Sequence, residues 1–149
     1  MKPWIVAFFV LQAAVMLFDE FYFHWRRGLP RWERIGHPID TLSVLAVLGF
    51  SIYVEPTAKE IPTFALLTTI SSFCVTKDEW IHAKLCGGFE HWAHAVLFLF
   101  HPILLLGAGW LWWTRERPIL FLETALIGTF LVYQVTYWNF LWPNLKVER

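Results

Sequence analysis

The 149-residue chain has few charged residues and few cysteines. Twelve basic and twelve acidic residues together make up 16% of it, and the formal net charge is zero. This balance leaves no basic excess for binding nucleic acid, so we expect no nucleic-acid partner. Cys74 and Cys86 form no CxxC pair, and the apolar surroundings of Cys74 favour a small buried residue. No small-residue cleavage site follows the first apolar stretch, which we therefore interpret as a retained membrane span.

Apolar and aromatic residues are abundant instead. The chain is 57% hydrophobic with a mean hydropathy of +0.48, whereas soluble proteins are about 45–50% apolar. Ten tryptophans and fourteen phenylalanines suit membrane interfaces better than a small soluble core. The composition predicts an all-α integral membrane protein that forms a single domain, residues 1–149.

Five apolar segments cover most of the chain: residues 3–18, 38–54, 62–75, 92–113 and 118–142. A membrane-spanning helix needs about 20 residues, and the fourth and fifth segments reach that length alone. The first and third reach it only if their helices continue through residues 19–24 and 78–82. We therefore expect about five transmembrane helices, two of which end in polar patches. Pro38, Pro62 and Pro118 occupy positions typical of first-turn prolines.

The two polar patches repeat one order of residue types. Each has two adjacent acids, a histidine, a glycine-containing spacer and then an aromatic residue followed by Glu-x-x-x-His. The residues are Asp19, Glu20, His24, Glu33 and His37 in the first patch, and Asp78, Glu79, His82, Glu90 and His94 in the second. The repetition predicts two tandem helix-pair repeats, about 3–54 and 62–113, followed by a fifth helix, about 118–142. Both pairs enter the membrane in the same sense, so the repeats are parallel and their connectors face each other.

Carboxylates and imidazoles at these spacings predict a metal site. Residues three or four apart lie on one face of a helix, and Glu-x-x-His is the spacing of diiron bundles. Mixed oxygen and nitrogen ligands suit iron or manganese, with zinc as an alternative; we expect two or three iron ions. The predicted ligands are Glu20, His24, Glu33, His37, Asp78, Glu79, His82, Glu90 and His94, with Asp19 and His91 as further candidates. The competing interpretation is an ion network with nearby arginines and no metal.

Polar residues within the apolar segments are candidates for supporting roles. Asp40 could orient His37 or stabilise a helix start. His101 lies on the face of His94, about 10 Å deeper, where a histidine is either functional or hydrogen-bonded in packing. Glu123 suits a lone structural carboxylate. Polar residues of the last segment could line a path for a substrate or a radical to the site, or form ordinary helix–helix hydrogen bonds. They are Tyr133, Gln134, Tyr137 and Asn139.

Two kinds of iron protein are similar to this pattern in part. Histidine-containing patches at the ends of membrane helices resemble the plan of membrane desaturases and hydroxylases, although those carry adjacent histidines and this chain has none. The glutamate-rich ligand set resembles ferritin-like diiron sites more closely, but those lie inside a soluble four-helix bundle.

These observations predict a small membrane metalloprotein with a multinuclear non-haem site. We expect oxygen-dependent oxidation of a lipid-soluble substrate, such as hydroxylation, desaturation or quinol oxidation, with a separate electron donor. One alternative is a metal-ion transporter or sensor. A transport path would need several binding residues across the bilayer, and the apolar segments offer only His101, which counts against this alternative. Another is a haem-binding electron-transfer protein, although haem has no need of the adjoining carboxylates.

The basic residues predict an orientation. Eight of the twelve Lys and Arg residues fall on the side of the polar patches, and the more basic side faces the cytoplasm. We therefore expect the N-terminus outside and the C-terminus and the metal site inside, in what would be a bacterial inner membrane.

Overall fold

The computed structural model describes residues 3–77 and 79–142, so the predicted ligand Asp78 lies outside the described residues. Within these ranges the chain forms helices and connecting turns, with no strand. The α-helices are α1 (Pro3–Phe18), α2 (Trp25–Arg27), α3 (Arg31–Tyr53), α4 (Ile61–Cys74), α5 (Glu79–Leu85), α6 (Gly88–Trp113) and α7 (Arg117–Thr136). Two π-helical turns, η1 (Asp19–His24) and η2 (Tyr137–Leu141), adjoin α1 and α7.

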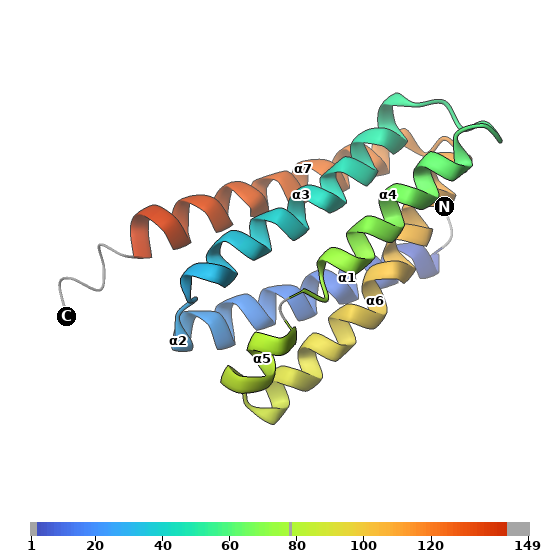
Figure 1. Ribbon diagram of the computed structural model, residues 1–149. Helices are drawn as coiled ribbons and strands as arrows, with labels where there is room; N and C mark the ends of the chain where they lie inside the picture. Colours follow the sequence, from blue (N-terminus) through green and yellow to red (C-terminus); the bar gives the residue numbers. More distant parts are fainter. Residues whose placement is uncertain (1–2, 78, 143–149) are drawn as a thin grey trace.

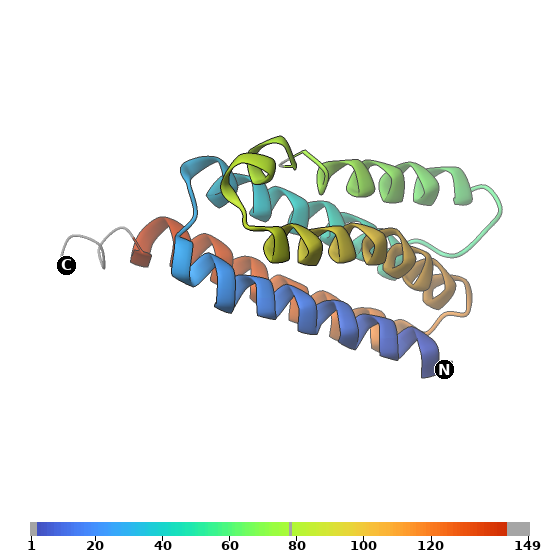
Figure 2. The same ribbon diagram turned by 90° about the horizontal axis from the view of Figure 1, so that it is seen from below.

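Four helices of the described chain are long and apolar enough to cross a membrane, which is typical of an integral membrane protein. They are Pro3–Arg27, Arg31–Tyr53, Gly88–Trp113 and Arg117–Leu141. The 14-residue α4 extends about 21 Å, which is less than the roughly 30 Å hydrocarbon core of a bilayer. It runs beside α3 and α6 (Figures 1 and 2). The expectation of about five spans is thus confirmed for four of them.

The two polar patches do not continue their helices in the same way. The first does so as predicted, since the helix runs unbroken from Pro3 to Arg27. The second does not, because α4 ends at Cys74 and a separate α5 begins at Glu79. Thr76 helps end α4, since its amide and its hydroxyl both bond the carbonyl of Phe73, at 3.1 and 2.9 Å, and compete with helical pairing. The prediction of one helix through residues 62–82 is wrong, and the tandem repeat stays a prediction.

The start of α3 also differs from the expected one. Pro62 and Pro118 lie in the first turns of α4 and α7, as predicted. Pro38 instead lies inside α3, which begins at Arg31. The apolar segment marked where the chain becomes hydrophobic rather than where it becomes helical. The two extra turns place Glu33 on the same rigid helix as the apolar residues.

The long helices form a bundle whose apolar core lies toward one end. α1 packs on α6, and α3 packs on α7 and α4 (Figure 1). The core includes Val47, Leu105 and Trp112, all buried. Gly109 allows α6 to approach α4, because a Cβ there would lie 2.8 Å from the ring of Phe64. The polar patches gather at the opposite end of the bundle, where α5 lies.

Candidate metal centre

Four histidines from four different elements meet at this end of the bundle. His24 belongs to η1, His37 to α3, His82 to α5 and His94 to α6. The ring centroids lie 4.2 Å apart for His82 and His94, 5.1 Å for His24 and His37, 6.3 Å for His24 and His94, and 6.5 Å for His37 and His82. All except the half-buried His37 are buried. The fold therefore brings the histidines of both sequence patches into one cluster.

Asp19 lies between two of these rings, those of His24 and His94. Its Oδ1 is 3.0 Å from Nε2 of His94, and its Oδ2 is 3.2 Å from Nε2 of His24. The side chain is buried. Ligand atoms of these three residues and of Glu90 all lie within 4.8 Å of one another. Asp19, a lower-ranked candidate in the sequence, is thus among the best-placed carboxylates.

The position of Asp19 depends on the π-helical turn η1. In an α-helix of 3.6 residues per turn, residues five apart project about 140° from each other. A π-helix closes its hydrogen bonds from i to i+5, so its turns are wider and side chains five apart come nearer to alignment. Asp19 and His24 have this spacing. The wide turn thus directs both side chains into the cluster.

A second group of possible ligands adjoins the first. Ligand atoms of His24, Glu33 and His37 lie within 4.8 Å of one another, as do those of His82, Cys86 and His94. Because the groups overlap at His24 and His94, they form neighbouring positions in one cluster. Glu33 is fully buried, and its Oε1 is 3.8 Å from Nε2 of His82. The arrangement offers ligands for more than one ion.

Several ring nitrogens of the cluster are buried without a hydrogen-bond partner among the described residues. They are Nε2 of His24, Nε2 of His37, both nitrogens of His82 and Nδ1 of His94. Buried polar atoms are almost always paired, and leaving one unpaired costs about 1–3 kcal/mol. Imidazole nitrogens are common metal ligands, so bound ions would satisfy these atoms. Ion pairs reach two of these nitrogens, Nε2 of His24 and Nε2 of His82, and leave Nε2 of His37, Nδ1 of His82 and Nδ1 of His94 without a partner among the described residues.

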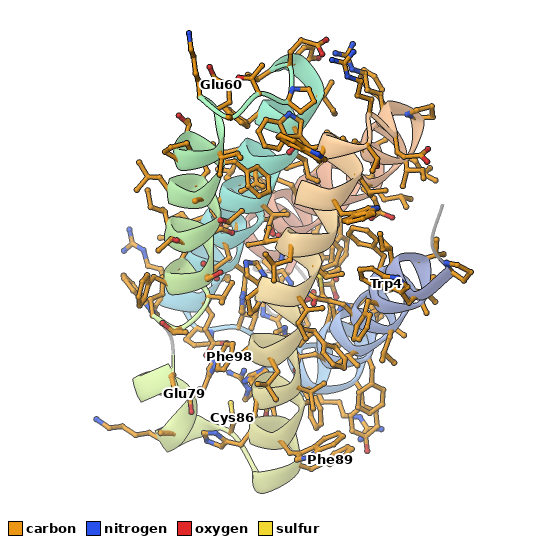
Figure 3. The ribbon with its side chains drawn as sticks, turned by 90° about the vertical axis from the view of Figure 1, so that its right-hand side faces the viewer. Trp4, Glu60, Glu79, Cys86, Phe89 and Phe98 are labelled. Atoms are coloured by element: carbon orange, nitrogen blue, oxygen red, sulfur yellow. The ribbon has the colours of Figure 1, made fainter. Side chains whose placement is uncertain are left out.

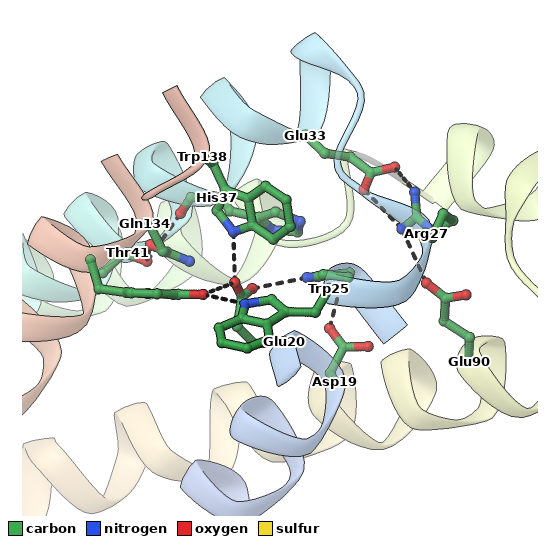
Figure 4. Close-up of polar contacts among 12 residues, drawn as sticks. Asp19, Glu20, Trp25, Arg27, Glu33, His37, Thr41, Glu90, Gln134 and Trp138 are labelled. Carbon is green, nitrogen blue, oxygen red and sulfur yellow. Dashed lines mark hydrogen bonds and ion pairs between the residues drawn. The ribbon is translucent and has the colours of Figure 1, made fainter. Parts of the chain in front are cut away.

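Arg27 pairs with two of the predicted carboxylate ligands. Its guanidinium donates to both oxygens of Glu33, at 3.2 and 2.9 Å, and to Oε1 of Glu90, at 3.0 Å (Figure 4). Gly28 follows with φ of 77°, a left-handed conformation that glycine adopts without strain, and reverses the chain so that Arg27 faces Glu33. The arginine offsets part of the negative charge, and Glu33 and Glu90 retain their ligand-forming positions.

Glu20, predicted as a ligand, contacts His24 from the outer side. Its Oε2 lies 3.0 Å from Nδ1 of His24, and its Oε1 accepts hydrogen bonds from Tyr133 at 2.8 Å and Trp138 at 2.6 Å (Figure 4). A carboxylate on one imidazole nitrogen fixes the tautomer and directs the other nitrogen toward a metal. Glu20 therefore orients His24, whose Nε2 faces Asp19.

Trp138 and Tyr133 both donate to Glu20; Trp138 was not predicted to act here, and Tyr133 was predicted only for a path to the site or for helix–helix hydrogen bonds. Tyr133 lies near the end of α7, and Trp138, five residues later, lies in the second π-helical turn, η2. Tyr133 also accepts a hydrogen bond from Trp25 Nε1 at 2.8 Å. Tyr137 stacks on the rings of Trp25 and Tyr133, and the exposed Asn139 donates to the carbonyl of its own helix. Of the predicted supporting residues in this segment, Tyr137 lies beside the network.

Two further predicted ligands lie outside the buried cluster. Nδ1 of His91 is 3.5 Å from Oε1 of Glu79, and the Glu79 side chain is half exposed. Figure 3 shows Glu79 on α5, at the same end of the molecule as Cys86. Neither Glu79 nor His91 belongs to the groups of possible ligands found among the described residues.

Asp40 has a partner other than His37, and His101 has a hydrogen-bond partner away from the cluster. Both carboxylate oxygens of Asp40 accept hydrogen bonds from Lys77, at 2.7 and 2.6 Å. Nε2 of His101 lies 3.0 Å from the hydroxyl of Ser71, which is 2.8 Å from that of Ser43. This contact with Ser71 favours the interpretation of His101 as a residue that is hydrogen-bonded in helix packing.

Two titratable groups outside the spanning helices have perturbed pKa values. Burial, with the nearby His94 second, lowers the pKa of His82 to about 3. Burial and a hydrogen bond to Glu90 raise the pKa of Cys86 to about 12. At neutral pH His82 is therefore uncharged, which is the form that binds metal. Cys86 is a further possible ligand. It is four residues from His82, the spacing of the other predicted pairs, and folding adds His94. Its raised pKa favours the thiol, whereas the thiolate is the form that binds metal.

Comparison with known proteins adds no family. No protein-family model, curated protein or solved structure matches the chain. The functional interpretation therefore depends on the chemistry of the cluster.

Proposed function

We propose that the protein is a membrane metalloenzyme with a non-haem centre of two or three iron ions that oxidises a lipid-soluble substrate with dioxygen. The observation that carries this proposal is the set of buried, unpartnered imidazole nitrogens interleaved with carboxylates. Mixed oxygen and nitrogen ligands of this kind suit iron or manganese. Structural zinc sites, by contrast, are typically rich in thiolates. Iron bound there would supply dioxygen activation.

The residues divide into ligands and groups that position them. Asp19, His24, Glu90 and His94 would hold one ion, and His37 with Glu33 would hold a neighbouring ion beside His24. His82 would complete the shell through a nitrogen that has no other partner among the described residues. Glu20 fixes the tautomer of His24, and Arg27 limits the repulsion between the two glutamates.

A cavity next to the cluster favours a lipid-soluble substrate. About 210 Å³ of space adjoins Asp19, His24 and His94 and continues between the spanning helices. Its exposed wall is mainly apolar, as is typical of sites for small apolar molecules. A substrate dissolved in the bilayer could reach the cluster without crossing water.

We expect a fusion of a reporter to the C-terminus to be active in the cytoplasm. α1 begins and α7 ends at opposite ends of the bundle (Figure 1), and the basic residues favour the α7 end as the cytoplasmic one. The metal centre would then face the cytoplasm of a bacterial cell, near its electron donor. The measurement compares a cytoplasmic and an extracytoplasmic reporter on the same chain. Activity of the extracytoplasmic reporter alone would reverse the orientation.

Purified protein is expected to contain at least two tightly bound iron ions per chain and no Soret absorption. Elemental analysis and an optical spectrum measure both quantities on one sample. A Soret band would identify the haem-binding alternative. Weak and exchangeable binding of several metals would favour the transporter or sensor. Zinc or manganese at full occupancy would support the proposed metal site but would contradict its assignment to iron.

A further inference from the structure

The cavity beside the metal centre extends deep into the bundle. One end is formed by residues of the cluster such as Asp19 and His94, and the wall continues along α1 to Phe9 and along α6 to Ala108. Phe98, which Figure 3 shows on α6 inward of Cys86, is part of the same wall. The cavity therefore lies within the membrane-spanning part of α1, α3, α6 and α7.

Two polar groups on the wall, away from the cluster, have no partner among the described residues. Oε1 of Gln12 is buried without a hydrogen bond, and Glu123 forms no hydrogen bond or ion pair within the described chain. By contrast, Gln134 accepts a hydrogen bond from Thr41 at 2.8 Å. In this orientation of the Gln12 side chain its amide oxygen can only accept, so a ligand that complements it brings a donor such as a hydroxyl.

The size of the cavity limits the reacting part of the ligand. An apolar cavity of about 150 Å³ is large enough for benzene, so 210 Å³ admits one substituted ring. Gln12 on α1 and Asp19, the first residue of η1, are seven residues apart on one continuous helix, which is about 10 Å along its axis. A ring with hydroxyls on opposite edges, with one hydrogen bond at each end, covers roughly this distance. A saturated chain would leave Gln12 unpaired.

We infer that the cavity binds the ring of a lipid-soluble quinol. One hydroxyl donates to Oε1 of Gln12, and the other faces Asp19 at the metal end. Ala13 lies on the wall and is also exposed, so the tail of the quinol leaves toward the lipid beside it. The binding site stands on the cavity itself, while its chemistry rests on the proposed function of the metal centre.

The corresponding reaction is balanced with dioxygen as the oxidant. Each quinol loses two electrons and two protons and becomes a quinone. Two quinols together supply the four electrons and four protons that reduce one dioxygen to two waters. With this substrate the quinol itself is the electron donor.

Binding is tested with a decyl-substituted benzoquinol and its dimethyl ether. The ether keeps the ring and tail but has no donor for Gln12. The protein is used as purified and under nitrogen, so that turnover is absent, and binding is measured by quenching of tryptophan fluorescence. We expect the quinol to bind about tenfold more tightly than the ether, as one buried hydrogen bond allows. Equal affinities would overturn the inference.

Three variants locate the bound ring. Gln12→Leu should reduce quinol affinity to that of the ether and leave ether binding unchanged. Ala13→Phe should abolish binding of both, because the added ring fills the cavity. The matched control is Ala14→Phe, since Ala14 is exposed on the same helix and does not line the cavity; it should bind both compounds normally. Unchanged quinol binding in Gln12→Leu or in Ala13→Phe would contradict the site.

Metal content and oxygen uptake separate this inference from the proposed function. All three variants should keep the iron content of the parent protein. Quinol binding that depends on Gln12, without quinol-dependent oxygen uptake, would retain the binding site and reject the oxidase function. Oxygen uptake with another lipid, together with no quinol binding, would retain the function and reject the inference.

Discussion

Replacing Asp19 with asparagine is expected to remove most of the bound iron. The substitution keeps the shape of the side chain but replaces a carboxylate that lies 3.0 and 3.2 Å from two imidazole nitrogens. It removes the negative charge and turns one oxygen into a donor group, which cannot bind a cation. Loss of an outer partner of a ligand costs about 10–100-fold in metal affinity, so loss of Asp19 should cost at least that much. Elemental analysis of purified Asp19→Asn protein measures the result.

Two further variants serve as controls for Asp19. Glu20→Gln should show the smaller loss, because Glu20 orients His24 through its Nδ1 rather than facing the cluster. Glu55→Gln should keep full iron content, because Glu55 is exposed at the opposite end of the bundle, where it pairs with Arg115. Full iron occupancy in folded Asp19→Asn protein would exclude Asp19 as a ligand.

Removal of iron is expected to lower the thermal midpoint of the detergent-solubilised protein by roughly 8–16 °C. Ions bound only by the folded state at about 1,000 times their dissociation constant contribute about 4 kcal/mol, and each kcal/mol corresponds to roughly 2–4 °C at this chain length. The physical cause is the burial of Asp19, Glu20, Glu33 and Glu90 at one end of the bundle. Arg27 offsets only part of this charge, because its single guanidinium pairs with two of the four carboxylates, those of Glu33 and Glu90.

The comparison requires melting curves before chelation, after chelation and after iron is restored at neutral pH. Elemental analysis must confirm that the chelated sample has lost its iron. The midpoint should recover when iron is added back. In Asp19→Asn protein, chelation should change the midpoint little, since most of the iron is already absent. An unchanged midpoint in verified metal-free parent protein would favour the ion network without metal.

The sequence pattern predicted the membrane class and the meeting of the two patches. Length and hydropathy predicted about five spanning helices, and the structure supports four of them within the described residues, because both properties are local. The repeated order of acids and histidines indicated that His24, His37, His82 and His94 would gather, and the structure brings their rings within 4.2–6.5 Å along the cluster. These inferences needed only the composition, the spacing of the residues, and the expectation that the two polar patches lie at the same end of the bundle.

Other features depended on contacts that spacing does not encode. A regular helical period favoured Glu20 as a ligand and left Asp19 as a further candidate. Glu20 does contact His24, but the π-helical turn brings Asp19 to the other ring nitrogen, on the side of the cluster. The assignment of Arg27 to two glutamates depends on the turn at Gly28. The break between α4 and α5 follows from local backbone bonds around Thr76. Each of these needed the geometry of a turn that the pattern of residue types leaves open.

The π-helical turn η1 also sets the rotational phase between α1 and the residues that follow it on the same continuous helix. Gln12 and Asp19 are seven residues apart, close to two full α-helical turns, so both face the interior. His24 would point about 140° away from Asp19 if the regular period continued. The wide turn inserts the equivalent of one residue and restores the phase. Shortening η1 by one residue would rotate Pro3–Phe18 by about 100° relative to His24. The one extra residue in η1 therefore keeps both the cavity wall and the cluster facing the interior of the bundle.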